Sequence, residues 1–324
     1  MSGSRPLLER TAESAVLEAP FMAAPSLSPA EAAYYGSQST VSDPGAYAGL
    51  YADLPRGVGE LARVVRGLFV HRVEGGQFGV PIAEDRMRDD AETRYIDDIL
   101  GLVAARDPRS LTCRRAWEDR FVGICRDFTL LHVSFLRHLG IPARLRSGFA
   151  TYFSDQGFHW DHVVTEYWDE ARGWLLADPQ IADPEHYAMD FDPMDVPRDR
   201  FLVAGAAWQA IRAGEVEARR FGLDLADDPK VGAWFVAGDI RLDLAALNKV
   251  ETLLWDIWGA GADNDADLTP EILALYDRAA AVTAGPAVDF AAARELFTAE
   301  DGLRTPATVR SLAPLRGPAY VTLR

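Results

Sequence analysis

The sequence predicts an α+β fold in which a helix packs on an antiparallel sheet, with a mostly helical region after it. Leu and Phe recur at helical spacing over 125–139. Gly140 then ends this helix, and Pro142 prevents it from resuming. Three strand-like stretches follow directly, at 143–153, 162–169 and 173–179. Consecutive strands with a short connection between the last two favour an antiparallel sheet.

The elements on either side divide the chain into four expected parts. Helical spacing also occurs at 57–72 and 93–106, before the central block, and beyond residue 195 it dominates. The candidate helices there are 201–213, 215–221, 242–258, 270–283 and 288–298. We expect the following parts: a loosely ordered N-terminal segment at 1–45, a catalytic core at 46–195, a helical region packing on the core at 196–300 and an extended tail at 301–324.

Composition and charge exclude some function classes. The 324 residues include 33 basic and 49 acidic side chains, for a net charge of −16. Nucleic-acid binding needs a basic face, so no nucleic-acid partner is expected, and an anionic membrane surface is disfavoured too. The two cysteines, the lack of a signal-peptide pattern and the lack of a long apolar stretch favour the cytoplasm. No cofactor or metal is expected.

Three residues of the central block have the chemistry of a catalytic triad. Cys125 begins the central helix, where unpaired N–H groups and the helix dipole stabilise a thiolate. His162 begins a strand, and Asp178 ends the next one. If these strands pair around the turn at 170–173, residue 162 falls roughly opposite residue 178 and the carboxylate can hold the imidazole through Nδ1. The spacing therefore predicts a nucleophile, its base and a carboxylate that orients the base.

The same block resembles a known family. The stretches GICRDFTLLHVSFLRHLGIPARLRSGF and DHVVTEYWDEARGWLLADPQ are similar to the transglutaminase-like superfamily over roughly 110–182. The resemblance implies a papain-like α+β fold and thioester chemistry, with Cys125 as nucleophile, His162 as general base and Asp178 as the orienting carboxylate.

Two departures limit what the resemblance implies. The family more often has a small residue and an aromatic after the histidine, whereas here Val163 and Val164 follow His162. The C-terminal half does not match the eukaryotic protein-crosslinking enzymes. Calcium dependence and glutamine specificity are therefore not carried over, and the pattern is that of a bacterial branch.

Four further residues are candidates for substrate binding, each with a structural alternative. Trp117 can line an oxyanion hole or belong to the core, and Trp160 can be an exposed aromatic contact or a core residue. Arg126 can bind an anionic group or lie on a solvated helix face. Gln180 can rim the pocket, as can Asp183. Cys113 is interpreted as structural.

The expected function is cysteine-dependent acyl transfer or amide hydrolysis through a thioester on Cys125. The substrate would be a small-molecule or peptide amide or ester, with an amine as the acceptor in a transfer reaction. The sequence leaves an acyltransferase, an amidase and a peptidase open. The alternative is a binding module that keeps the fold without catalysis.

Overall fold

The computed structural model describes residues 26–154, 156–261, 264–286 and 288–324. Residues 1–25 of the expected loosely ordered segment lie outside the described residues. The rest of that segment differs from the expectation, because α1 (Pro29–Gly36) forms behind its N-cap Ser28. The reason is an aromatic anchor: Tyr35 is fully buried and meets Trp174 edge to face.

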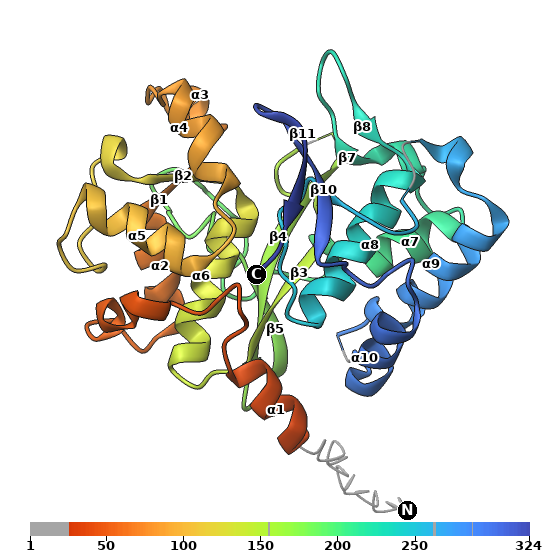
Figure 1. Cartoon of the computed structure of the whole chain (residues 1–324), viewed down its shortest axis with the longest axis horizontal. Coiled ribbons are helices and arrows are strands. Elements are labelled where there is room, and N and C mark those ends of the chain that lie inside the picture. The colour runs from red at the N-terminus through yellow and green to blue at the C-terminus, as the bar shows by residue number, and fades with distance from the viewer. Residues whose placement is uncertain (1–25, 155, 262–263, 287) are drawn as a thin grey trace, which may run out of the picture.

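A six-stranded sheet forms the centre of the molecule (Figure 1). Its strand order is β6-β3-β4-β7-β8, with β5 also paired to β4. The strands are β3 (Ala143–Ala150), β4 (His159–Asp169), β5 (Gly173–Ala177), β6 (Phe201–Val203), β7 (Phe221–Leu223) and β8 (Lys230–Val231). The three strands expected from sequence pair antiparallel, β3 with β4 and β4 with β5.

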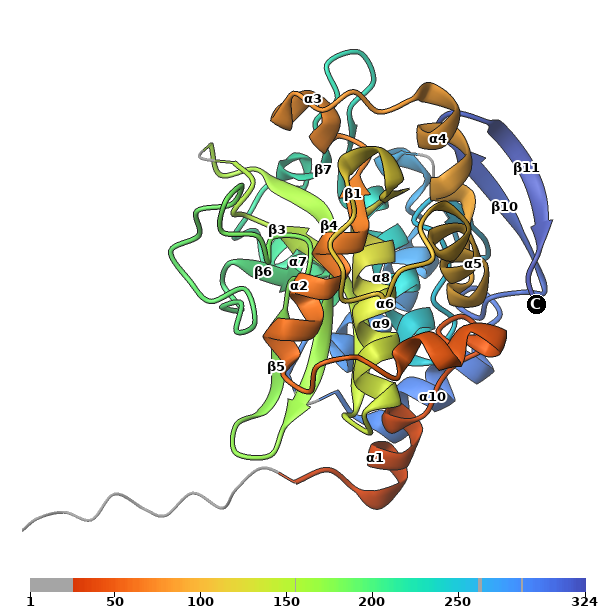
Figure 2. The same cartoon turned by 90° about the vertical axis from the view of Figure 1, so that its left-hand side faces the viewer.

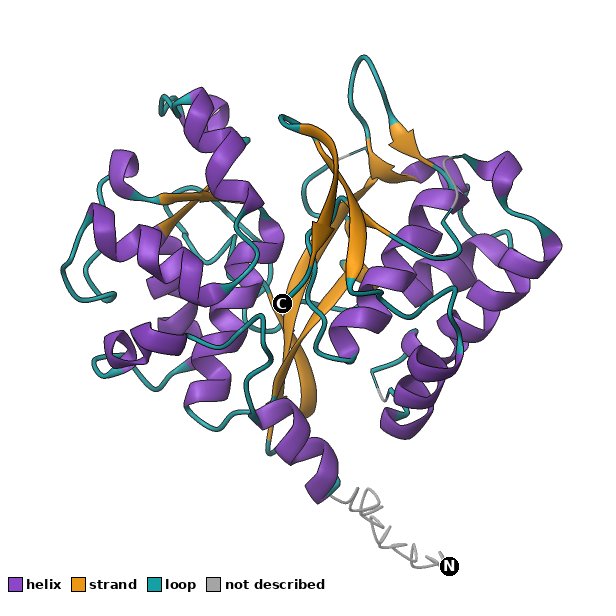
Figure 3. Ribbon diagram, in the orientation of Figure 1, coloured by secondary structure: helices purple, strands orange, loops and turns teal. Residues whose placement is uncertain are grey.

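Helices from the first half of the chain lie on one side of this sheet (Figures 1 and 3). The main ones are α2 (Val58–Leu68), α5 (Ile96–Arg106) and α6 (Cys125–His138). A parallel pair, β1 (Phe69–His71) with β2 (Phe121–Gly123), leads into α6. Shorter helices are α3 (Glu74–Phe78), α4 (Glu84–Asp89), η1 (Gly45–Tyr51), η2 (Asp90–Glu92) and η3 (Trp117–Asp119).

Helices from the C-terminal half lie on the other side in the same view. They are α7 (Ala204–Arg212), α8 (Ala233–Leu247), α9 (Pro270–Thr283) and α10 (Phe290–Ala299), with η4 (Ala218–Arg220) and η5 (Asp265–Asp267). These helices pack on Phe149 of β3 and Phe221 of β7. The C-terminal half thus continues the core of the sheet.

The expected helix at 242–258 is wrong in its position. The helix α8 begins at Ala233 and ends at Leu247, because Lys249 adopts a left-handed backbone with φ of 62°. Residues Asp256–Ile257 form β9 instead of helix. Nearly all residues in the second half of α8 are buried. Its sequence therefore lacks the clear alternation of apolar and polar faces by which a helix is predicted.

The end of the chain forms a hairpin. In Figure 2, β10 (Thr308–Ala313) and β11 (Gly317–Thr322) lie side by side, and β10 also pairs with β9. The residues of the expected extended tail therefore adopt strand conformation within a three-stranded sheet. Along the described ranges, none of the helices combines the length and the apolar character that crossing a membrane requires.

Candidate active site

Cys125 is the first residue of α6, directly after the strand β2. The carboxylate of Asp127 holds this helix start, since its Oδ2 accepts the Ile124 N–H at 2.9 Å and its Oδ1 accepts from Arg126 at 3.0 Å. Cys125 is only 5% exposed. The Asp127 and Phe128 N–H groups donate to the Ile124 carbonyl oxygen, whereas those of Cys125 and Arg126 have no backbone acceptor among the described residues.

His162 lies in β4 and reaches Asp178, which follows the end of β5. The distance from His162 Nε2 to Asp178 Oδ2 is 2.8 Å. In the observed register Thr165 pairs with Ala177, so residue 178 comes level with residue 164 and not with 162. Residues 162 and 164 point to the same side of β4, so the His162 side chain can reach Asp178 diagonally across the strand pair. The ring nitrogen that contacts the carboxylate is Nε2, whereas the sequence suggested Nδ1.

Two further groups fix the Asp178 carboxylate. The hydroxyl of Tyr152 donates to Oδ2 at 2.7 Å, and the backbone N–H of Gln180 donates to Oδ1 at 2.9 Å. Asp178 is fully buried, so these contacts replace the water that a carboxylate would otherwise bind. The sequence did not indicate the contact of Tyr152 with Asp178, because an aromatic residue next to a strand is typical of the hydrophobic core.

The charges of the site favour the protonated imidazole. Burial lowers the pKa of His162, but the Asp178 carboxylate and, after it, the Cys125 side chain raise it more, to about 10. The structure places the His162 ring 2.8 Å from the Asp178 carboxylate.

The four other candidate residues have different surroundings. Trp117 packs on Phe78, Arg120 and His186. The buried guanidinium of Arg126 bonds Asp127 and the carbonyl oxygens of Arg94 and Glu251. These contacts hold the Arg126 guanidinium inside the protein, so it does not lie on a solvated helix face.

Trp160 and Gln180 remain near the triad. Trp160 precedes His162 by two residues in β4 and its Nε1 has no hydrogen-bond partner among the described residues. Gln180 contributes its backbone N–H to Asp178, and its buried Oε1 has no partner in the described part of the chain. Gln180 therefore positions the carboxylate through its main chain.

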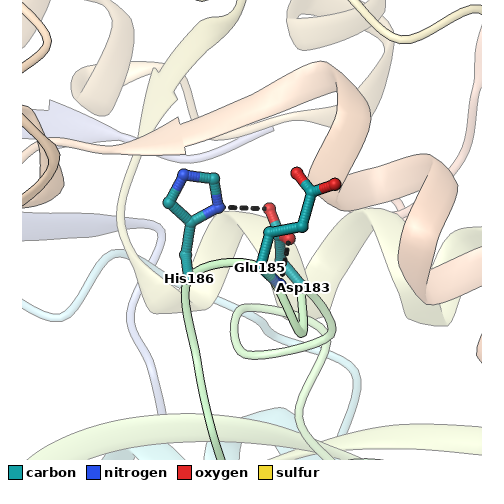
Figure 4. Close-up of side chains that lie close together, drawn as sticks. All are labelled: Asp183, Glu185 and His186. Atoms are coloured by element: carbon teal, nitrogen blue, oxygen red, sulfur yellow. Dashed lines mark hydrogen bonds and ion pairs between the residues drawn. The ribbon is translucent and has the colours of Figure 1, made fainter.

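Asp183, Glu185 and His186 form a cluster with metal-ligand chemistry (Figure 4). The Asp183 carboxylate accepts from His186 at 3.0 Å and from Arg114 at 3.3 Å, and Arg66 lies 3.7 Å away. These cations already balance its charge, so the cluster does not have the excess of negative charge that attracts a divalent ion.

Two surface hollows lie apart from the sulfur. One of about 370 Å³ is lined by residues of α2 and of the loop before α2, and one of about 270 Å³ by Gly59, Arg63 and residues between 181 and 194. Neither includes Cys125.

Part of the chain matches a known family model. Residues 88–179 match the family model described as the transglutaminase-like superfamily. The fold and this match together define a transglutaminase-like core, and they support a cysteine-based enzyme in general. The match includes all three triad residues and excludes α7 to α10.

Similarity beyond that model is limited. A solved structure described as a "Putative Cysteine Protease from Cytophaga hutchinsonii" has 15% sequence identity and a TM-score of 0.31. The alignment covers 48% of this chain and 44% of that one. No curated protein matches the sequence.

Proposed function

We propose that the protein is a cysteine acyltransferase or amide hydrolase that forms a thioester on Cys125. The observation that carries the proposal is the contact of His162 Nε2 with Asp178 Oδ2 at 2.8 Å, and the Cys125 side chain is among the groups that raise the pKa of this imidazole. A nucleophile, a base and an oriented carboxylate are the three parts that such chemistry needs.

The reaction follows from these positions. The Cys125 thiolate attacks the carbonyl carbon of an amide or ester, forming the C–S bond, while the His162 imidazolium gives its proton to the leaving amine or alcohol as the C–N or C–O bond breaks. Water or an amine then attacks the thioester, His162 accepts the proton of that nucleophile, and the C–S bond breaks to restore the thiolate. The free N–H groups at the start of α6 support the transient oxyanion.

The low exposure of Cys125 limits the substrate. A side chain that is 5% exposed admits a small or extended acyl group more readily than a bulky one. The proposal therefore favours a small-molecule amide or ester, or a flexible peptide side chain, as the acyl donor.

Intact-protein mass spectrometry tests the proposal. The protein is incubated with a set of small acyl donors, such as activated esters and amides, and its mass is compared with that of Cys125→Ala. We expect a mass increase equal to one acyl group in wild type and none in Cys125→Ala. Cys113→Ala is the matched control and should acylate like wild type, because the second cysteine lies outside the triad.

A second measurement separates the enzyme from a non-catalytic binding module. Iodoacetamide alkylation of Cys125 is followed across pH in wild type and in His162→Ala. An enzyme should react well below the ordinary thiol pKa of about 8.5 and lose this reactivity in His162→Ala. An ordinary thiol profile in both proteins would support the binding module.

A further inference from the structure

The hollow of about 270 Å³ that is lined by the start of α2 and by the segment 181–194, called the α2 hollow below, has the lining of a ligand site. Much of this lining is apolar: Ile181 is only 1% exposed, and Met189, Phe191 and Met194 also contribute. Ligand sites in proteins are mostly apolar with a few polar groups, and those for drug-sized ligands measure ~300–1,000 Å³. The α2 hollow therefore suits a small molecule with an apolar body.

The cation of this lining has no partner. Arg63 of α2 is exposed, and it forms neither an ion pair nor a hydrogen bond through its side chain among the described residues. Its guanidinium borders a gap left by Gly59: a Cβ on that glycine would lie 3.7 Å from Arg63 Nη1 and 3.3 Å from Met194 Cγ. Since Met194 lines the α2 hollow, the positive charge lies at its wall.

The two acidic residues of the lining do not cancel this charge. The Asp183 carboxylate already has three cationic neighbours, as described for its cluster. Asp192 is exposed, and its Oδ1 accepts the Met194 N–H at 2.9 Å. In the described part of the chain neither acid forms an ion pair with Arg63. The guanidinium is thus free to bond a carboxylate from solution, which it can do through two parallel N–H···O bonds.

The α2 hollow adjoins the residues that hold Asp178. The Pro193 carbonyl oxygen accepts the Asp178 N–H at 2.7 Å, and the centres of the Phe191 and Tyr152 rings are 5.3 Å apart. Both Pro193 and Phe191 line the hollow, whereas Cys125 does not. A ligand bound there would contact the segment that supports the carboxylate of the proposed triad, and not the nucleophile.

We propose that the α2 hollow binds a small organic anion with an apolar body and one carboxylate, which pairs with Arg63. The apolar body covers Met189, Phe191 and Met194, and removal of this apolar surface from water favours binding. The net charge of −16 repels anions in general, so binding of a carboxylate depends on this local cation. The inference goes beyond the proposed function and does not require it, because Cys125 takes no part.

Methyl NMR of the full chain, with carbon-13 in the methionine methyl groups, tests the site. Met189 and Met194 line the hollow, whereas Met87 lies on α4 outside it, and Met→Leu variants assign the three signals. The probes are hexanoate, hexanol and hexylammonium at about 0.15 M salt, which screens charges more than ~8 Å apart. Hexanoate should shift the Met189 and Met194 signals until they saturate and leave the Met87 signal unchanged.

The charge of the probe and of the protein should both matter. Hexanol and hexylammonium should bind at least about fivefold more weakly than hexanoate, and Arg63→Gln should weaken hexanoate binding by a similar factor. Arg56→Gln is the matched control, because Arg56 is also exposed and without an ion pair in the described ranges but does not line the hollow. It should keep the wild-type affinity. Equal losses in the two variants, or equal binding of hexanoate and hexanol, would overturn the site.

A steric variant gives an independent test. Gly59→Leu places a side chain in the gap between Arg63 and Met194, so hexanoate should no longer shift the Met189 and Met194 signals. Circular dichroism checks that the variant keeps its fold. Unchanged hexanoate shifts in folded Gly59→Leu would contradict binding in this hollow.

The outcomes separate this inference from the proposed function. Hexanoate should bind Cys125→Ala as tightly as it binds wild type, whatever the reactivity of the sulfur. Loss of binding in Cys125→Ala would contradict a separate site. Failure of Cys125 to form an acyl adduct contradicts the proposed function alone, and failure of hexanoate to shift Met189 and Met194 contradicts the α2 hollow alone.

Discussion

At the scale of single residues, the position of Asp178 determines the charge of the site. Its carboxylate accepts from the His162 imidazole, the Tyr152 hydroxyl and the Gln180 N–H. The first of these contacts raises the pKa of the His162 imidazole, and Asp178 is the largest of the influences that raise it. The contacts with the Tyr152 hydroxyl and the Gln180 N–H fix the position of the carboxylate beside the imidazole.

Asp178→Asn should lower the pKa of His162 from about 10, because the amide keeps the shape of the side chain but carries no charge. Alkylation of Cys125 by iodoacetamide at pH 7 should fall by about 100-fold or more, as expected when a triad loses its carboxylate. NMR titration of the imidazole gives the pKa directly. Asp195→Asn, which changes an exposed ion pair with Arg172, is the control and should leave both quantities unchanged.

The same variant has a stability signature with a defined sign. The pKa of His162 is higher in the folded state than its ordinary 6.5, so the folded state binds this proton more tightly. The stabilisation is fully present below pH 6.5 and is lost as pH rises towards about 10. Urea unfolding should therefore show a difference between wild type and Asp178→Asn that is largest below pH 6.5 and narrows at higher pH. A difference independent of pH would contradict this account.

At the scale of the elements, close approach of strands beside His162 requires a glycine. Gly148 of β3 pairs with His162 on one side and with Val203 of β6 on the other. A Cβ at this position would lie 2.2 Å from the Leu202 carbonyl oxygen and 2.8 Å from the Val203 Cα. Both obstacles are backbone, so β6 would have to move away from β3.

Gly148→Ala should therefore destabilise the protein by about 3 kcal/mol or more, as overpacking against backbone does. Since β3 also holds β4 in place, alkylation of Cys125 should slow as well. Gly76→Ala is the matched control: no atom lies within 4 Å of its added Cβ, and it lies inside α3, so its stability should be unchanged or about 0.5–1 kcal/mol higher. Chemical unfolding monitored by circular dichroism measures both. An unchanged midpoint for Gly148→Ala would contradict the close approach.

The elements also explain which parts of the structure the sequence could predict. The helix at 125–138, the three strands after it and the contact of His162 with Asp178 follow from local spacing and turn signals. These features depend on residues that are near one another in the chain. They are also the features that the transglutaminase-like resemblance implies.

Other parts depend on contacts between distant segments. The strands β6 and β7 are only three residues long, and their place in the sheet comes from pairing with β3 and β4. The hydroxyl of Tyr152 gains its role only once the fold brings Asp178 within 2.7 Å.

At the scale of the whole molecule, buried ion pairs join the transglutaminase-like core to the C-terminal helices. Arg146 of β3 bonds both Glu166 of β4 and Asp243 of α8, at distances of 2.9 to 3.0 Å. Arg137 of α6 bonds Glu251 in the same manner. These side chains are fully buried, so removing one partner leaves a charge that water cannot reach.

Asp243→Ala should therefore lower the free energy of unfolding by about 3–5 kcal/mol at neutral pH, because it leaves Arg146 partly unpaired and the Ser147 N–H without its acceptor. Glu217→Ala, which breaks an exposed pair with Arg219, should cost less than about 1 kcal/mol. Urea unfolding of both variants is followed by circular dichroism and by tryptophan fluorescence. The two signals should change together in wild type, because α8 packs against β3 and shares its buried charges. Separate transitions, with Asp243→Ala affecting only one of them, would show that the C-terminal helices fold as an independent unit and that the ion pairs do not join the two halves.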